Sequence, residues 1–278
     1  MNVITVNVGQ GALSIIRHNK EAIIVDCRIP PSSDATVAFV KQMFATSLKD
    51  HRVKGLVLTG FDEDHTDVLG TAIVLQKYRP DWVLYPQYYK DTQEAKAVFW
   101  LIRQQEKERQ GTASPFRSIS VRVDKLSNRK LPGLSTNFEF ELFSPHIEDM
   151  SSSNNSSIVL KVTGIGPTGF SYLITGDTET ERWQSIARFF GDALKSHVLA
   201  AAHHGSINGV HAASLLHIDP HTVLISAGVD SQYGHPDPAA VKAYQRVARH
   251  VYSTNMQGGV SLLTQPGSKE LTTTLIPS

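Results

Sequence analysis

The chain opens with short runs in which apolar and polar residues alternate, the period expected of strands. Three such runs, 3–8, 12–17 and 21–26, are separated by the segments GQG and HNK. Glycine and asparagine mark tight turns because both tolerate the backbone conformations that a reversal requires. The start of the chain is therefore predicted to form a hairpin followed by a third strand.

From residue 34 onward the apolar spacing becomes helical. Asp34 is predicted as the N-cap of a helix that runs to about Leu48, with Val37, Val40 and Phe44 along one face. Strands and helices then alternate. Further strands are predicted at 54–59, 82–85, 118–123, 137–143, 158–163, 171–175, 198–202, 222–227, 260–263 and 271–276, and helices at 68–78, 92–110, 178–190, 210–217 and 238–250.

Both halves of the chain run from hairpin-forming strands into strand–helix alternation. Such a duplicated plan predicts an α/β fold in which two mixed β-sheets pack face to face with helices outside, an αββα sandwich. No segment is typical of a domain boundary. A single domain over residues 1–278 is therefore expected.

Composition narrows the classes of function. With 27 basic and 26 acidic residues the formal net charge is +1, so the protein has no overall field that would attract nucleic acid or an anionic membrane. The longest apolar runs, such as 22–25 and 198–202, are too short to span a bilayer. The N-terminal MNVITVNV lacks the zones of a signal peptide, and the single Cys27 forms no internal disulfide. A cytoplasmic protein without a membrane span is expected.

The segment 59–70, TGFDEDHTDVLG, places the charged residues Asp62, Glu63, Asp64 and His65 directly after the apolar run at 55–58. Ligand and metal sites often lie at the ends of buried strands in α/β proteins. The alternative interpretation is a solvated acidic turn that caps the next helix through Asp64 or Thr66.

Other predicted strands also end on polar side chains that bind metals. A shared site is the simplest explanation, because unpaired buried charge costs several kcal/mol and a cation compensates it. Carboxylates and imidazoles together suit Zn, Mn or Fe, and the absence of thiolates argues against a structural cysteine-type zinc site. The strand-end residues are Asp26, Asp62, Asp64, His65, Asn154, Asn155, Asp177, His203, His204 and His235.

These residues stand in short motifs: VGQGA at 8–12, IVDCR at 24–28, TGFDEDH at 59–65, NNSS at 154–157, ITGD at 174–177, HHGS at 203–206 and YGHP at 233–236. In this order they resemble the metallo-β-lactamase fold family, and within it the metallo-hydrolase domain of the ComEC-type competence proteins. The resemblance extends from about Asn2 to Thr264. It implies the αββα fold and a hydrolase that uses one or two divalent ions, Zn or Mn.

The resemblance also assigns roles to residues. It implies that Asp64 and His65 bind the second of two neighbouring metals, that Asp177 bridges both, and that His235 closes the set. Asp62 corresponds to a ligand of the first metal, and Asn155 or its neighbour stands where many relatives have histidine. His203 is a further candidate ligand, and the division of roles between His203, His204 and His235 stays open.

Several positions depart from the family pattern. Gly60 stands where relatives have the first histidine of the loop, which impairs the first metal site. Asn7 and Ala12 replace aspartates, and Arg28 replaces a glycine. Two hypotheses follow: a hydrolase with one tight metal and a weak or substrate-recruited second, or a fold whose catalysis is reduced or lost.

Metal-assisted hydrolysis of a phosphodiester, with DNA as the substrate that the resemblance implies, is the predicted activity of this free-standing hydrolase module. Asp62 or Asp64 is expected to orient the attacking water, His204 and Ser206 to contact phosphoryl oxygens, and His203 or His204 to protonate the leaving group. For HHGS the alternative is a helix-capping serine beside structural histidines. The local basic candidate for DNA is the segment 90–109 with Arg117, Arg122, Lys125 and Arg129.

Two other functions remain open at this point. One is a hydrolase of a small ester or phosphoester. The other is a catalytically degenerate metal-binding subunit that regulates or binds a protein partner, for example in a defence system.

Overall fold

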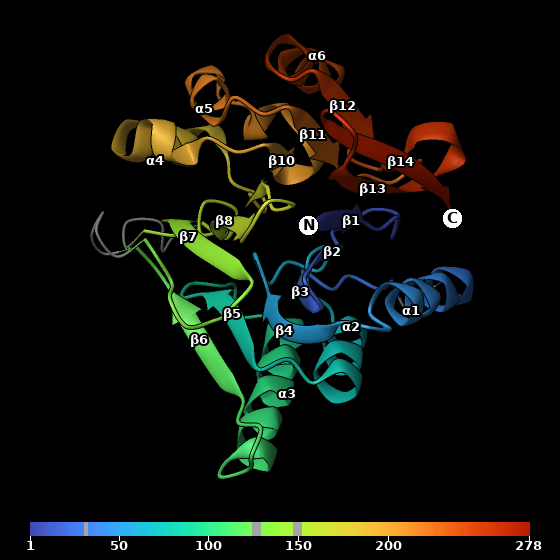
Figure 1. Cartoon of the computed structure of the whole chain (residues 1–278), viewed down its shortest axis with the longest axis vertical. Helices are drawn as coiled ribbons and strands as arrows, with labels where there is room; N and C mark the ends of the chain where they lie inside the picture. The colour runs from blue at the N-terminus through green and yellow to red at the C-terminus, as the bar shows by residue number, and fades with distance from the viewer. Residues whose placement is uncertain (31–32, 124–128, 147–151) are drawn as a thin grey trace.

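A computed structural model places two mixed β-sheets between two layers of helices (Figure 1). The structure describes residues 1–30, 33–123, 129–146 and 152–278. The helices α4 (Thr180–Phe190), α5 (Ala212–Ile218) and α6 (Pro238–Val247) lie above the sheets in Figure 1, and α1 (Asp34–Ser47), α2 (Val68–Ile73) and α3 (Gln93–Arg109) lie below them. The predicted αββα sandwich is confirmed.

The larger sheet has eight strands and combines parallel with antiparallel pairs. Its members are β1 (Asn2–Thr5), β2 (Ser14–His18), β3 (Glu21–Val25), β4 (Arg52–Val57), β5 (Trp82–Pro86), β6 (Arg117–Val121), β13 (Val260–Pro266) and β14 (Leu271–Pro277). They lie in the order β14-β13-β1-β2-β3-β4-β5-β6, and the strands from β3 to β6 run parallel.

The smaller sheet has six strands: β7 (Phe138–Ser144), β8 (Val159–Gly164), β9 (Ser171–Ile174), β10 (Val198–Ala200), β11 (Thr222–Ile225) and β12 (His250–Ser253). Its order is β12-β11-β10-β9-β8-β7, with β9 to β12 parallel. The carboxyl ends of the parallel strands in both sheets carry the loops from which the polar motifs project.

The central strands of the larger sheet are apolar on both faces because both faces are covered. In β3, Ile24 contributes to the core under α1 and α3, whereas Ile23 and Val25 contribute to the core shared with the smaller sheet. In β4, Leu56 and Val57 divide in the same way. Successive side chains of a strand point to opposite faces, so a continuous apolar run supplies both cores at once.

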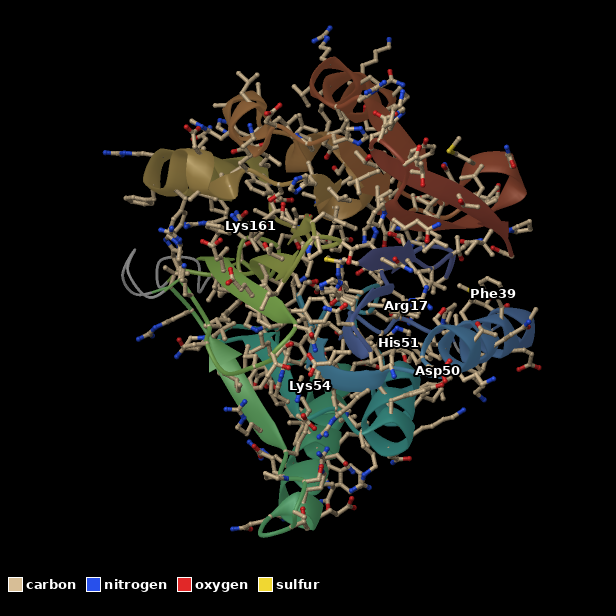
Figure 2. The ribbon with its side chains drawn as sticks, in the orientation of Figure 1. Arg17, Phe39, Asp50, His51, Lys54 and Lys161 are labelled. Atoms are coloured by element: carbon tan, nitrogen blue, oxygen red, sulfur yellow. The ribbon has the colours of Figure 1, made fainter. Side chains whose placement is uncertain are left out.

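Two lysines of the strands, the buried Lys161 and the half-buried Lys54, are paired with carboxylates. Lys161 of β8 lies 3.1 Å from the carboxylate of Glu141 and donates a hydrogen bond to the carbonyl of Ala193 (Figure 2). Lys54 of β4 lies 2.6 Å from Asp81. Pairing of this kind compensates the loss of hydration that burial imposes on each charge.

The lone Cys27 is fully buried and takes part in the core under α1 and α3. Burial raises the pKa of its thiol far above the ordinary range, although a hydrogen-bonding contact with Thr71 works against that rise. Cys27 is therefore a packing residue and not a reactive thiol.

Several predicted boundaries are wrong. The helix predicted at 238–250 ends at Val247, and residues 250–253 form β12, because parallel pairing with β11 competes successfully with helical continuation. Ser33, not Asp34, caps α1. The helix at 68–78 divides into α2 and a π-helical segment, η1 (Val74–Tyr78), and its cap is Asp67, whose carboxylate accepts the N–H of Gly70 at 2.6 Å.

Within the described ranges, no helix combines the length and the apolar character needed to cross a membrane.

Candidate metal centre

Four loops, each at the carboxyl end of a strand, converge between the two sheets. Parallel strands deliver their following loops to the same edge, which explains why residues so distant in sequence meet. The loops after β4 and β9 to β11 carry the motif residues Asp62, Asp64, His65, Asp177, His203, His204 and His235.

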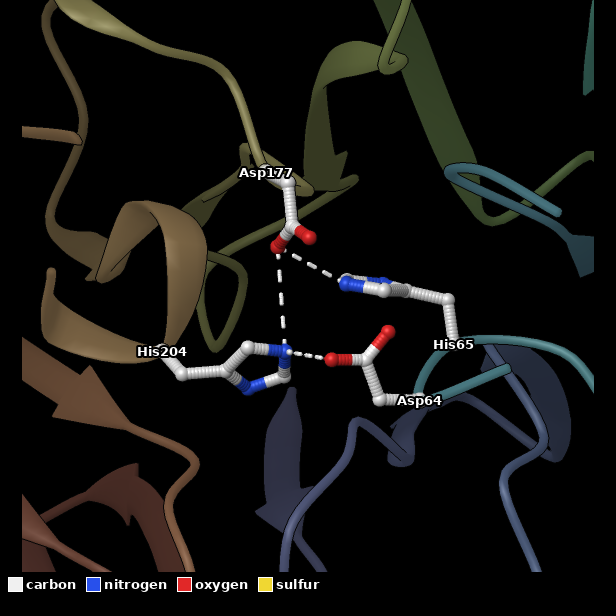
Figure 3. Close-up of side chains that lie close together, drawn as sticks. All are labelled: Asp64, His65, Asp177 and His204. Atoms are coloured by element: carbon white, nitrogen blue, oxygen red, sulfur yellow. Dashed lines mark hydrogen bonds and ion pairs between the residues drawn. The ribbon is translucent and has the colours of Figure 1, made fainter. Parts of the chain in front are cut away.

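Four of these side chains form a tight cluster: Asp64, His65, Asp177 and His204 (Figure 3). One ligand atom from each lies within 4.8 Å of the others. His65 Nε2 is 2.8 Å from Asp177 Oδ1. His204 Nε2 is 3.3 Å from Asp64 Oδ2 and 3.7 Å from the same oxygen of Asp177. Two imidazoles therefore converge on one buried carboxylate, with a second carboxylate beside them.

Both imidazoles make a second hydrogen-bonding contact through Nδ1, on the side of the ring away from the cluster. His65 Nδ1 lies 2.9 Å from Asp26 Oδ2, and Asp26 also accepts the backbone N–H and the hydroxyl of Thr59, each at 2.7 Å. His204 Nδ1 lies 2.9 Å from the carbonyl oxygen of Ser226. A carbonyl only accepts, and the hydroxyl of Thr59 is already used toward Asp26, so each Nδ1 is the donor. Each Nε2 then turns its free electron pair toward the carboxylates in the neutral ring.

The electrostatics of the cluster require positive charge. Burial opposes the charged form of both rings, but the neighbouring carboxylates outweigh it and raise the pKa of His65 well above its ordinary value and that of His204 above it as well. Burial likewise opposes ionisation of Asp64 and Asp177, but the two rings hold the pKa of each carboxyl below its usual value. The cluster therefore holds ionised carboxylates that need a compensating cation: protons on the rings, or a metal ion.

The donor set fits a divalent metal. Two Nε2 atoms fixed by hydrogen bonds at Nδ1, together with two carboxylates, form a nitrogen and oxygen set that suits Zn²⁺ or Mn²⁺. Among the described residues, His204 Nε2 is buried and has no hydrogen-bond partner of good geometry, so its electron pair is available to a cation. Asp64, His65, Asp177 and His204 would hold the ion.

The backbone at this centre is unusual. Asp26, His203 and His204 all have left-handed φ angles, of 54°, 51° and 53°. This conformation is costly for residues other than glycine and is concentrated at functional sites. Gly205 follows with φ 79°, and a Cβ there would lie 2.8 Å from Pro236. The turn thus directs His204 into the cluster and leaves no room for a side chain after it.

His203 and His235 lie in an open cleft of about 200 Å³ in front of the cluster. Their ring centroids are 5.7 Å apart, and in the part of the chain that the structure describes His235 Nδ1 is buried without a hydrogen-bond partner. Burial and the neighbouring imidazoles lower the pKa of His235, which favours the neutral ring. The other residues that line the cleft are Gln10, Asp62, Asp64, Asn154, Asp177, His204 and Tyr233.

The asparagines and the serine of the motifs have structural partners. Asn155 accepts the backbone N–H of Glu179 at 3.2 Å, whereas Asn154 lines the cleft and donates to the carboxylate of Glu179 at 3.1 Å. Ser206 is buried and its hydroxyl oxygen accepts the N–H of Asn208 at 3.3 Å, in the manner of a helix cap. The predicted metal role of Asn155 and the predicted substrate role of Ser206 have no supporting contact and stay predictions.

The loop at 59–70 offers few ligands for the predicted first metal. Gly60 offers no side chain, and a Cβ at this position would meet no heavy atom of the described residues within 4 Å. Asp62 lies 3.1 Å from the ammonium group of Lys90, which is more than half exposed. Within the described residues, Asp62 is thus committed to a cation that the protein itself supplies.

Several contacts of the site do not follow from the sequence. Asp26 is one of the predicted strand-end residues, and the structure adds its supporting role behind His65. Gln10 stands in the GQG turn beside the cleft, and both amide atoms of its side chain are buried without a hydrogen-bond partner among the described residues. Thr59, Ser226 and Lys90 contact the site through tertiary packing, for which the local sequence has no signal.

Comparison with known proteins identifies the fold. No family model matches the chain. The chain is 27% identical over 219 residues to ComE operon protein 3 of Bacillus subtilis (strain 168). The aligned region covers 78% of this chain and 25% of that protein. The chain therefore spans about a quarter of the length of this relative.

Two solved structures share the architecture. The metallo-β-lactamase fold protein YhfI from Bacillus subtilis superposes with a TM-score of 0.53 at 11% identity, covering 94% of this chain and 99% of YhfI. Igni18 from Ignicoccus hospitalis KIN4/I, described as a metallo hydrolase, gives a TM-score of 0.55 at 14% identity, with 96% and 100% covered. At these identities the likeness concerns the fold alone.

Proposed function

We propose that this chain, which has the metallo-β-lactamase fold and is related in sequence to ComE operon protein 3, is a metal-dependent hydrolase that cleaves a phosphodiester. One observation carries the proposal. His65 and His204 each commit Nδ1 to an acceptor and direct Nε2 at the carboxylate of Asp177, from opposite sheets of the sandwich. A core that needed only packing would not place two ionised carboxylates and two imidazoles together.

A divalent ion held by Asp64, His65, Asp177 and His204 would supply Lewis-acid chemistry, which activates a water molecule and polarises a phosphoryl oxygen. The protein's own residues do the rest. Asp26 and Ser226 fix the rings of His65 and His204 so that their Nε2 electron pairs face inward. His203 and His235 line the cleft. In this proposal His235 would complete the ligand set, and His203 would donate a proton to the leaving oxygen.

Lys90 and Asp62 would act at the mouth of the cleft. The ammonium of Lys90, paired with Asp62 at 3.1 Å, is an exposed positive charge able to exchange its carboxylate partner for a phosphate oxygen of the substrate. Asp62, once released, is free to orient the attacking water.

The phosphodiester, and DNA in particular, is supported by the sequence relationship and only weakly by surface charge. Of the basic residues expected to bind DNA, Arg109 is buried and donates to backbone carbonyls, and Arg129 lies 2.9 Å from Glu141. Lys125 lies outside the described residues. Since binding to a nucleic-acid backbone depends on free clustered cations, short phosphodiesters are expected to be cleaved as well as DNA.

The shortage of ligands for the predicted first metal favours a second candidate function. Gly60 supplies no ligand and Asp62 pairs with Lys90, so a chain that binds a single ion and serves as a regulatory partner of another protein is the alternative.

The test combines metal content with activity. The purified protein, loaded with Zn²⁺ or Mn²⁺, is assayed on DNA, RNA and a chromogenic phosphodiester, and its bound metal is counted by mass spectrometry. Asp177→Asn is expected to lower both the metal content and the rate, the rate by at least about 100-fold. Asp192→Asn, which changes a carboxylate that is 93% exposed, is the matched control and should leave both unchanged.

Metal bound at the cluster without cleavage of any of these substrates would reject the hydrolase and favour the regulatory alternative. Full activity of Asp177→Asn would reject the assignment of the centre.

A further inference from the structure

A second group of metal-binding side chains lies at the other end of the smaller sheet. His221 directly precedes β11 and His250 begins β12, whereas the candidate metal centre follows the carboxyl ends of β9 and β10. Because β9 to β12 run parallel, these two ends of the sheet are opposite. Glu270 joins the two histidines from the turn between β13 and β14 of the larger sheet.

The three side chains are already close enough to share an ion. One ligand atom from each lies within 4.8 Å of the others, and His221 Nε2 is 3.4 Å from Glu270 Oε2. The two imidazole rings are 5.2 Å apart between centroids. Ligands on a tetrahedral ion with bonds of about 2.0–2.1 Å are separated by roughly 3.3 Å, so the histidine–carboxylate pair needs almost no movement and His250 a small one.

His221 is oriented as a metal ligand is. Its Nδ1 lies 2.9 Å from the hydroxyl of Thr222, a buried residue, and its Nε2 faces Glu270. In the tautomer in which Nδ1–H donates to the hydroxyl of Thr222, the electron pair of Nε2 is free for a cation.

The backbone around the group is fixed independently of any ion. The carbonyl of His221 accepts the N–H of His250 at 3.1 Å, and the N–H of His221 donates to His197 at 3.0 Å. The turn that carries Glu270 is closed by the hydrogen bond from Gly267 N–H to the carbonyl of Glu270 at 2.8 Å. The ligands therefore stand on ordered backbone from three segments.

The site is accessible to a hydrated ion. His221 and Glu270 have side chains 24% and 37% exposed, and both line a cavity of about 330 Å³. Arg249 pairs with Glu270. Its side chain is 64% exposed, so it can turn into solvent when a divalent ion takes its place.

We propose that His221, His250 and Glu270 form a second metal site, for a Zn²⁺-like ion, separate from the candidate metal centre. Two imidazoles and one carboxylate leave a fourth position for water. The ion would join β12, the edge strand of the smaller sheet, to the hairpin at the edge of the larger sheet. Its role is therefore to clamp the two sheets together at the end remote from the reaction.

The experiment uses the full chain with the candidate metal centre disabled by Asp177→Asn and His204→Gln. Isothermal titration with Zn²⁺ is expected to show one remaining site in this background. Adding Glu270→Gln or His250→Gln should weaken that site at least about 10-fold, the lower end of what loss of a supporting group costs. Zn²⁺ should also raise the thermal unfolding midpoint of the background protein, and should raise it less in the Glu270→Gln variant.

His217→Gln is the control, because His217 lies 2.9 Å from Asp192 as an exposed histidine–carboxylate pair outside either cluster. It should leave the remaining site unchanged. A background protein that binds no Zn²⁺, or one whose binding survives both Glu270→Gln and His250→Gln, would overturn the proposal. Glu270 lies in a partly exposed turn, so its replacement tests the site even if a change in β12 impairs folding. Because the background lacks the candidate metal centre, the result is independent of whether the proposed hydrolase is active.

Discussion

Replacing Asp26 with asparagine tests whether the ring of His65 is held as a metal ligand. Asp26 is buried, accepts two hydrogen bonds from Thr59, and lies 2.9 Å from His65 Nδ1. Asparagine has nearly the same shape and tolerates the left-handed backbone at this position, where φ is 54°. The substitution therefore changes hydrogen-bonding character without a demand for backbone movement.

The expected effect follows from the proton on the ring. The amide oxygen of asparagine can still accept from Thr59, which leaves its NH₂ group facing His65 Nδ1. His65 then accepts at Nδ1 and carries its proton on Nε2, which points at Asp177 and no longer offers an electron pair to a metal. Loss of such a supporting carboxylate lowers metal affinity about 10- to 100-fold, or about 1.4–2.7 kcal/mol.

The measurement is competition for Zn²⁺ between the protein and a chromophoric chelator, for the wild type, Asp26→Asn and the control Asp192→Asn. Circular dichroism of the metal-free proteins checks that the fold is retained. If Asp26→Asn bound Zn²⁺ as tightly as the wild type, the inference that Asp26 sets the protonation of His65 would be refuted.

Three further outcomes are expected. Gly60→His has room for its side chain and should raise bound metal toward two ions per chain and metal-supported hydrolysis by about 10-fold; unchanged values would show that position 60 is not limiting. Gly205→Ala, with φ 79° and its Cβ 2.8 Å from Pro236, should lower the free energy of unfolding in urea by about 1–3 kcal/mol, and equal stability would contradict the strain argument. Burial opposes ionisation of Asp81, but hydrogen bonds from cations, Lys54 foremost, hold its pKa below the ordinary value. The ionised Asp81 therefore stabilises the fold above about pH 4, and this contribution is lost as the pH falls through the lower folded-state pKa. Asp81→Asn should lower the free energy of unfolding by under about 1 kcal/mol at pH 7 and by less at pH 3. A larger loss at pH 3 would contradict this reasoning.

Much of the architecture could be predicted because strands that are covered on both faces appear in the sequence as continuous apolar runs. Residues 22–25 and 55–58 are such runs, and both become central strands. The boundary near residue 248 could not be predicted in this way. Val247 and Val251 fit either a helix or a strand, and the decision depends on pairing with β11, more than twenty residues earlier in the chain.

In the candidate site, too, some residues have a local sequence signal and others depend on tertiary contacts. A carboxylate or histidine after a buried strand is a local signal, and it led to Asp64, His65 and Asp177. The local sequence does not determine which histidine of HHGS enters the cluster. His203 and His204 share a left-handed backbone, and His204 enters because the carbonyl of Ser226 holds its Nδ1.

The position of β1 has a consequence for synthesis of the protein. β1 lies between β2 and β13, and Val3 pairs with Ile16 on one side and with Thr264 on the other. The first partner leaves the ribosome at once, but the second follows 261 residues later (264 minus 3), which takes on the order of 15–50 s at bacterial or eukaryotic speeds. Throughout that time the nascent chain carries an unpaired apolar strand edge, the feature that invites aggregation and chaperone binding. The pairing of β13 with β1 thus ends the exposure of this strand edge.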